Sequence, residues 1–171
     1  MSLVTGPDRE LEKFERMVAD HQTALLRMCC LHLGDLALAE DAVQETFLKA
    51  WRALSTFRGE SSEKTWLMRI AINVCRDMQR GNWFRFVDRR RTASALPEAV
   101  SPIEPYEEQL VADVMNLPVK LREVILLYYY QGMNTLEIAD SLGISQSSVS
   151  GRLKRGREKL KKELEGSDDH V

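Results

Sequence analysis

Apolar residues recur every three or four positions through most of the chain, which is the spacing of one face of a helix. No segment alternates apolar and polar residues as a half-buried strand would. The helices expected from this pattern, before a further pair near the C-terminus, span residues 11–33, 36–54, 66–80, 106–116 and 119–130. The pattern therefore predicts an all-α protein.

The helical pattern is interrupted at residues 92–105, where Pro97, Pro102 and Pro105 are interspersed with serines. Such a composition is typical of a linker. A chain of 171 residues is long enough for two small domains. We therefore expect two helical domains, residues 8–84 and 106–165, joined by a flexible linker at residues 85–105.

Residues 134–162 space two amphipathic helices around one glycine. Asn134 and Glu137 are placed to form a capping box, Gly143 to end the first helix, and Ser145 to cap the second. The expected core stripe of the second helix is Val149, Leu153, Leu160 and Leu164. This arrangement predicts a helix-turn-helix.

The second of these helices carries small polar residues followed by cations. Its expected outward face comprises Ser147, Ser150, Gly151, Lys154 and Arg155. Small residues allow a close approach to base edges, and cations attract phosphates. The alternative is a solvated basic helix that closes a small bundle, but the capped pair with its glycine turn favours DNA binding.

The helix at residues 36–54 has two distinct faces. Its inward face is expected to contain Val43, Phe47, Ala50, Trp51 and Leu54. A separate outward stripe consists of Asp41, Gln44, Glu45 and Leu48. A leucine among acidic residues indicates either a plain solvated face or a surface on which a partner helix docks.

The helix at residues 66–80 combines an apolar stripe with a cationic line. The stripe consists of Trp66, Leu67, Ile70, Ala71, Val74, Cys75 and Met78. The line consists of Arg69, Asn73, Arg76 and Arg80, which share another face of the helix. Such a line can follow a phosphate backbone and read one base with the amide, or it can be an ordinary charged surface.

The segment after this helix mixes aromatic residues with arginines. Trp83, Phe84 and Phe86 alternate with Arg85 and precede further arginines. Aromatic rings among cations can stack on bases, or they can complete the core of the first domain. The spacing leaves both interpretations open.

Composition limits the remaining possibilities. The formal net charge is only -2, so nucleic-acid binding has to depend on local basic patches. Cys29, Cys30 and Cys75 are too few and too unevenly spaced for a disulfide framework or a zinc site, so we expect buried thiols. His21 and His32 near Cys29 could be imagined as metal ligands, but the wider ligand set is missing, and we expect no metal and no cofactor.

The sequence also lacks the marks of an enzyme or a membrane protein. No phosphate-binding glycine loop and no nucleophile with a nearby base is found, so we expect no catalytic residue and no small-molecule substrate. No run approaches the roughly 20 apolar residues of a membrane span, and no secretory signal is recognisable. A cytoplasmic protein is expected.

Three segments carry a resemblance to a known family. They are AEDAVQETFLKAW at residues 39–51, TWLMRIAINVCRDMQR at residues 65–80 and LPVKLREVILLYYYQGMNTLEIADSLGISQSSVSGRLKRGREKL at residues 117–160. Together and in this order they resemble the extracytoplasmic-function (ECF) group of bacterial sigma factors. The resemblance covers nearly all of residues 14–164.

The resemblance implies a division of labour between the two domains. The first would bind the clamp helices of the largest subunit of RNA polymerase and melt the minus ten promoter element, and the second would read the minus thirty-five element. The implied polymerase contacts are Asp41, Gln44, Glu45 and Leu48. The implied minus ten contacts are Arg58, Ser61, Ser62, Lys64, Arg69, Asn73, Arg76 and Arg80. The implied minus thirty-five contacts are Ser145, Ser147, Ser148, Ser150, Gly151, Arg152, Lys154 and Arg155.

Further expectations come from the same resemblance. The loop at residues 58–64 would hold a base swung out of the stack, and Trp66 would be structural. An anti-sigma factor, often tethered to the membrane, would hold the protein inactive. Gly156 replaces the usual alanine and should cost the helix about 0.8 to 1 kcal/mol unless close packing needs it. The alternative is a helix-turn-helix regulator that acts without docking on the polymerase.

Overall fold

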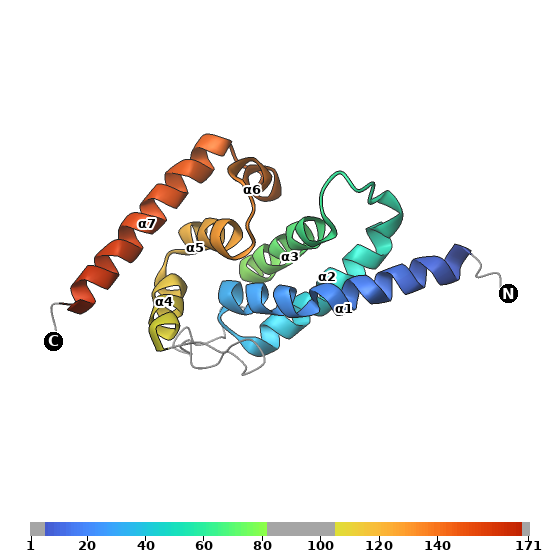
Figure 1. The fold of residues 1–171 in the computed structure, drawn as a ribbon, viewed down its shortest axis with the longest axis horizontal. Coiled ribbons are helices and arrows are strands. Elements are labelled where there is room, and N and C mark those ends of the chain that lie inside the picture. The colour runs from blue at the N-terminus through green and yellow to red at the C-terminus, as the bar shows by residue number, and fades with distance from the viewer. Residues whose placement is uncertain (1–5, 82–104, 169–171) are drawn as a thin grey trace.

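The computed structural model describes residues 6–81 and 105–168 of the chain. The aromatic and arginine cluster that begins at Trp83, and nearly all of the predicted linker, lie outside these residues. Within them every regular element is a helix, so the all-α prediction is confirmed (Figure 1). None of these helices has the length and apolar character needed to cross a membrane.

The described helices form two groups. The first comprises α1 (Gly6–Leu33), α2 (Leu36–Ala53), the short 3-10 helix η1 (Leu54–Thr56) and α3 (Glu63–Arg80). The second comprises α4 (Pro105–Asn116), α5 (Val119–Ile125), the π-helical turn η5 (Leu126–Tyr130), α6 (Thr135–Leu142) and α7 (Gln146–Asp168). Figure 1 shows α5 between α7 and the first group, with α6 beside α3.

Two helices begin earlier than the apolar pattern predicts. Helix α1 starts at Gly6, and its first turns, residues 6–13, have exposed side chains and project at the N-terminal end (Figure 1). Helix α3 starts at Glu63 because Ser62 caps it, accepting a hydrogen bond from the backbone N–H of Thr65 at 3.1 Å. The loop was predicted to continue to Thr65, but it ends at Ser62, so the predicted end of the loop was wrong.

The helix-turn-helix has the predicted caps. The Asn134 side chain accepts from the Glu137 N–H, and the Glu137 carboxylate accepts from the Asn134 N–H, both at 2.9 Å. Gly143 ends α6 at φ 64°, a left-handed conformation that favours glycine. The Ser145 hydroxyl accepts from the backbone N–H of Ser148 at 3.2 Å at the start of α7. The chain therefore turns sharply between α6 and α7.

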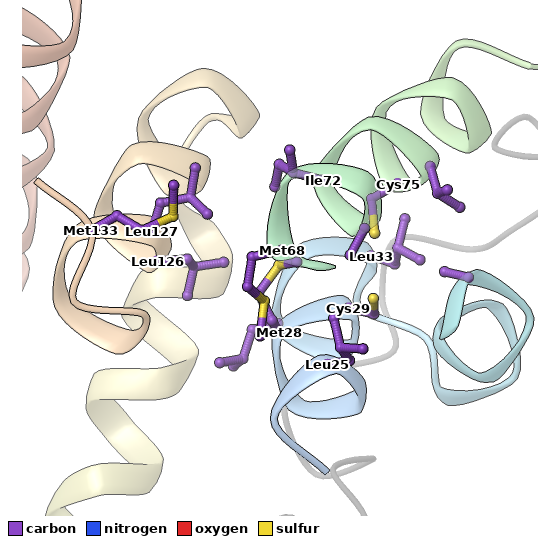
Figure 2. Close-up of a cluster of buried hydrophobic side chains, with 14 of the residues drawn as sticks. Leu25, Met28, Cys29, Leu33, Met68, Ile72, Cys75, Leu126, Leu127 and Met133 are labelled. Carbon is purple, nitrogen blue, oxygen red and sulfur yellow. The ribbon is translucent and has the colours of Figure 1, made fainter. Parts of the chain in front are cut away.

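Helix α3 is buried on two sides rather than one. Its predicted stripe faces α1 and α2, with Leu67 and Cys75 fully buried. Met68 and Ile72, which were not predicted to be buried, are as inaccessible as Leu67 and Cys75, whereas Trp66, Ile70 and Met78 of the predicted stripe are only partly buried. Figure 2 shows Leu126 of η5 pointing toward Met28 and Met68. The two helical groups therefore pack against each other through a shared apolar core.

One predicted core residue of α2 was placed wrongly. Trp51 was expected to point inward but is 42% exposed. It lies near the end of α2 and contacts Phe14 edge-on, with ring centroids 5.1 Å apart. The packing of α1 against α2 therefore covers only part of the indole.

The three cysteines are free buried thiols, as the sequence predicts. The pKa of Cys29 is raised by a hydrogen bond with Cys75 and by burial. Burial also raises the pKa of Cys30 to about 12. Thiols with raised pKa values stay protonated and unreactive near neutral pH, so these residues serve as small apolar packing groups.

Gly156 of α7 is required by close packing. A Cβ atom built at this position would lie 2.9 Å from Cγ1 of the buried Ile125. At Gly151, in the same helix, an added Cβ would meet nothing within 4 Å. The two glycines therefore offer a matched pair of substitutions.

We expect Gly156→Ala to lower the free energy of unfolding by about 1 kcal/mol, because overpacking outweighs the gain in helix propensity. Gly151→Ala should raise it by roughly 0.5 to 1 kcal/mol, because only the gain in propensity applies. Urea unfolding followed by circular dichroism measures both changes. Equal stabilisation by the two alanines would show that the contact with Ile125 relaxes without cost.

Candidate nucleic-acid interface

The cationic line on α3 is only partly exposed. Asn73 and Arg80 lie on the open surface, whereas Arg69 and Arg76 are half-buried. The Arg76 guanidinium is directed toward the second helical group, where its Nη1 donates to the Leu142 carbonyl at 3.0 Å. The structure therefore confirms a shared face for these four residues but gives them unequal access to solvent.

A cavity of about 330 Å³ lies between the loop before α3 and the first turns of that helix. Phe57 and Trp66 line it and stack on each other with centroids 4.7 Å apart. Arg58, Ser61 and Arg69 contribute polar groups to the same cavity. Within the described residues, Nε of Arg69 is buried and has no hydrogen-bond partner. Aromatic walls with a guanidinium beside them are suited to a flat polar ring.

Two residues expected in this loop have other positions. Ser62 is the N-cap of α3, and its hydroxyl donates to the Thr65 hydroxyl at 3.0 Å. Lys64 lies in the first turn of α3. Neither side chain lines the cavity, whereas Arg58 and Ser61 do.

The outward stripe of α2 is accessible as predicted. Asp41, Gln44 and Leu48 are exposed, with Leu48 at 52%. Glu45 lies 3.9 Å from Lys49 in an i,i+4 pair at the surface, which contributes little to stability. An exposed leucine flanked by carboxylates is available for a protein partner.

The outward face of α7 is also accessible. Ser147, Ser150, Lys154 and Arg155 are exposed, and the backbone at Gly151 has open space beside it. The other two serines of the predicted contact set, Ser145 and Ser148, are exposed as well, and their hydroxyls hydrogen-bond to each other at 2.9 Å.

Arg152, the remaining residue of the predicted minus thirty-five contact set, is mostly buried and is paired with an acid. Its Nη1 lies 3.4 Å from the Glu123 carboxylate, and its side chain is 16% exposed. Nearby, Nε of Arg157 donates to the Tyr129 hydroxyl at 2.6 Å.

The two helical groups correspond to two known sequence families. Residues 17–85 match Sigma-70 region 2, and residues 109–160 match Sigma-70, region 4. The ECF RNA polymerase sigma factor SigL of Mycobacterium tuberculosis is 35% identical over 160 residues, which cover 90% of each chain. This chain belongs to the ECF sigma factors. It directs RNA polymerase to promoters and is not itself an enzyme, so a regulator acting without the polymerase is excluded.

Solved structures of sigma factors share this fold. CnrH in complex with the cytosolic domain of CnrY has a TM-score of 0.67 at 32% identity, covering 91% of this chain and 90% of CnrH. RpoE of Bartonella quintana, solved with the anti-sigma factor NepR, gives 0.70 at 24% identity and is similar in fold. The chain also matches 40% of the length of the probable sigma factor RfaY of Xanthomonas campestris, with 30% identity.

A buried carboxylate joins the two regions of this sigma factor. Glu123 of α5 has a side chain that is only 3% exposed. Its carboxylate lies 3.4 Å from Nη1 of Arg152, 3.6 Å from Nε2 of His32 and 3.8 Å from Nε of Arg76. Glu123 of region 4 therefore contacts Arg152 of the same region and both His32 and Arg76 of region 2.

His32 is completely buried at this junction. The Gln79 amide N–H group approaches both Nδ1 and the carbonyl of His32, at 3.1 and 3.3 Å. Because an amide N–H group can only donate, Nδ1 accepts and the proton resides on Nε2, which faces Glu123. Burial lowers the pKa of His32 below its ordinary value of 6.5, Arg122 and Arg76 lower it further, and Glu123 opposes the shift.

The His32 environment predicts a loss of stability in acid. A histidine with a lowered pKa in the folded state takes up its proton more readily when unfolded. Its effect is absent above pH 6.5, and stability falls as the pH drops from 6.5 toward the lowered pKa of the folded state. Urea unfolding midpoints measured between pH 7.5 and 5.5 test this expectation. A His32→Gln variant should lose this part of the pH dependence, and an unchanged slope would contradict it.

Sequence reasoning missed Glu123, His32 and the cavity walls. Glu123 sits within an apolar run, LREVILL, where a charge at a core position was the available signal. Trp66 was assigned a structural role only, and Phe57 was not singled out. The ring contact between them appears only when the loop folds back on α3.

Proposed function

We propose that this ECF sigma factor engages the minus ten element through α3 and the adjacent cavity, the minus thirty-five element through α7, and the polymerase through α2. The observation that carries the proposal is that Phe57, Trp66 and Arg69 line one cavity, at the start of the line that continues to Asn73 and Arg80. A base leaving the duplex near α3 would find stacking surfaces and a donor there.

Capture of a base is a plausible source of the energy for melting. Extruding a base from a duplex costs a few kcal/mol, and stacking on an aromatic side chain returns about 1 to 3 kcal/mol. A hydrogen bond from the guanidinium of Arg69, which lines the same cavity, would add to this. Binding energy thus replaces nucleotide hydrolysis in opening the promoter.

Helix α7 is suited to the minus thirty-five duplex. Ser147, Ser150 and Gly151 keep the outer face narrow, so that the helix can approach the base edges. Lys154 and Arg155 follow one turn later and are free to contact phosphates on the flank of the groove. Ser145 caps the start of the helix through the backbone N–H of Ser148, and the N-terminus of a helix also suits a phosphate.

The stripe on α2 is the proposed polymerase-binding surface. Asp41, Gln44, Glu45 and Leu48 form a compact acidic surface with one apolar side chain at its end. We propose that it contacts the clamp helices of the largest subunit. Opposite charges on those helices would speed association and set the register of the two proteins.

An anti-sigma factor is a further proposed partner. CnrH was solved with the cytosolic domain of CnrY, and RpoE with NepR. By analogy we propose that a protein of this kind holds the chain inactive by covering its polymerase-binding surface. The chain would then act in the cytoplasm and would be held at the membrane when such a partner is tethered there.

Run-off transcription with purified core polymerase on a library of random promoters tests the proposal. The expected result is a pair of enriched elements at a fixed separation. Asn73→Ala should relax the preference at one position of the minus ten element and leave the minus thirty-five element unchanged. The assignment of α3 to the minus ten element would be wrong if this variant altered only the upstream element.

A further inference from the structure

Regions 2 and 4 meet along a seam with an apolar centre. Met28 of α1 and Met68 of α3 are fully buried there, and Leu126 of η5 points toward both (Figure 2). Met68 and Arg76 lie two helical turns apart on the same side of α3. The face of α3 that is directed at region 4 is therefore apolar at one end and cationic at the other.

The polar edge of the seam is made by α5 and the end of α6. Glu123 approaches Arg76 and His32 of region 2 at 3.8 and 3.6 Å. Arg122 donates to the His32 carbonyl at 2.9 Å and to the Met115 carbonyl at 2.7 Å, so its guanidinium connects α1 with α4. The Arg76 guanidinium also caps the C-terminal end of α6 through the Leu142 carbonyl.

We propose that these contacts form an intramolecular clasp that keeps the free sigma factor closed, and that the clasp competes with promoter DNA for Arg76. The clasp consists of Glu123 and Arg122 on region 4 and His32 and Arg76 on region 2. The competition rests on the proposed role of Arg76 at the minus ten element. The existence of the clasp does not depend on that role.

The competition follows from the donors of one guanidinium. In the closed arrangement Nε of Arg76 faces the Glu123 carboxylate and Nη1 donates to a helix C-terminal carbonyl. These acceptors occupy the sites that phosphate oxygens would take, and the Arg76 side chain is 24% exposed. Nε and the engaged N–H of Nη1 cannot serve both sets of acceptors at once, so a phosphate contact that uses these donors requires region 4 to move away from α3.

Opening the seam preserves the contacts within each region and breaks those between the regions. Glu123 keeps Arg152, because both belong to region 4, and therefore remains charge-paired. Opening would separate Leu126 of region 4 from Met28 and Met68 of region 2, and it would break the hydrogen bond from Arg122 to the His32 carbonyl. Binding of core polymerase therefore has to supply the free energy that holds the regions apart.

The closed state can be measured with spin labels at Ser55→Cys and Lys162→Cys, both exposed and one in each region. The three native cysteines are buried. Double electron–electron resonance on the full chain should give one narrow distance distribution. Glu123→Gln should move a large part of the population to longer distances, because Arg76, Arg122 and Arg152 then repel one another without a compensating charge. Glu158→Gln, an exposed site on α7, is the matched control and should leave the distribution unchanged.

Arg76→Gln provides a second variant that leaves the Glu123 pair with Arg152 intact. It should open the seam as Glu123→Gln does, and it tests the clasp if Glu123→Gln does not fold. The clasp would be overturned if both variants fold and both give the same distance distribution as the unsubstituted labelled protein. If only Arg76→Gln folds, an unchanged distribution in that variant alone would overturn it.

The competition is tested by binding of a single-stranded minus ten oligonucleotide chosen from the run-off experiment. Glu123→Gln should bind about fivefold more tightly than the unsubstituted chain, because a larger fraction of molecules is open. Glu158→Gln should stay within about twofold. An open distance distribution without tighter binding would overturn the competition, while loss of the Asn73→Ala effect in transcription would be a failure of the proposed minus ten site instead.

Discussion

Reversing two charges on α2, in the variant Asp41→Arg with Glu45→Arg, is expected to weaken binding of core polymerase by at least about 100-fold. Both carboxylates are accessible, and Leu48 lies beside them on the same stripe. Like charges placed across a complementary interface cost several kcal/mol, which corresponds to two or more orders of magnitude in affinity. The fold should persist, because Glu45 has only a surface contact with Lys49.

Titration of labelled core polymerase with each variant measures the affinity, and circular dichroism measures the fold. The control is Glu12→Arg with Glu15→Arg, which makes the same change in charge on the exposed part of α1. Binding of the α2 variant at the unsubstituted affinity would remove the stripe from the polymerase interface. Equal losses in both variants would indicate a general effect of net charge.

Periodicity and capping chemistry predicted most of the fold. The capping box at Asn134, the left-handed Gly143 and the Ser145 cap are local features, so a short segment contains all the information they need. Helix starts were less predictable, because α1 continues beyond the apolar stripe into residues that nothing covers. The inward position predicted for Trp51 was wrong, because spacing along α2 does not show how much of the indole α1 covers.

The sequence predicted which residues of the candidate site share a helix face, but it did not predict which residues contact one another. Spacing placed Arg69, Asn73, Arg76 and Arg80 on one side of α3, and the structure agrees. Spacing could not show that Glu123, far along the chain, would approach Arg76, because that contact depends on how region 4 packs on region 2. The burial of Met68 has the same origin.

The charged residues inside the LREVILL segment connect these observations. Arg122 and Glu123 are buried in the middle of an apolar run, where unpaired charges would be strongly unfavourable. Glu123 meets Arg152 within region 4 and His32 and Arg76 across the seam. A buried charge that has a partner on each side of an interface makes the packing specific, since a shifted arrangement would leave it unpaired. The same residues thereby couple the fold of region 4 to its placement.

The second large effect is expected from a substitution of Arg69, which lines the cavity beside α3. Arg69→Met keeps most of the length of the side chain but removes the guanidinium, and it should lower the rate of promoter opening by about 10- to 100-fold. A hydrogen bond to a charged group contributes about 1.5 to 3 kcal/mol, which corresponds to this range. The aromatic walls, Phe57 and Trp66, remain in place and should retain part of the base binding. Polymerase affinity should not change, because α2 is untouched.

Permanganate reactivity of melted thymines follows opening directly, and binding of a single-stranded minus ten oligonucleotide follows base capture. Arg16→Met is the matched control, because Arg16 is an exposed arginine on α1 and does not line the cavity. Arg69→Lys should restore only part of the activity, since an ammonium keeps the charge but lacks the planar donor set. Full activity of Arg69→Met would show that the buried Nε is not a base-binding group. Equal defects in the Arg69→Met and Arg16→Met variants would reduce the role of Arg69 to nonspecific attraction of phosphates. Only a defect confined to the cavity distinguishes capture of a base from attraction to the backbone.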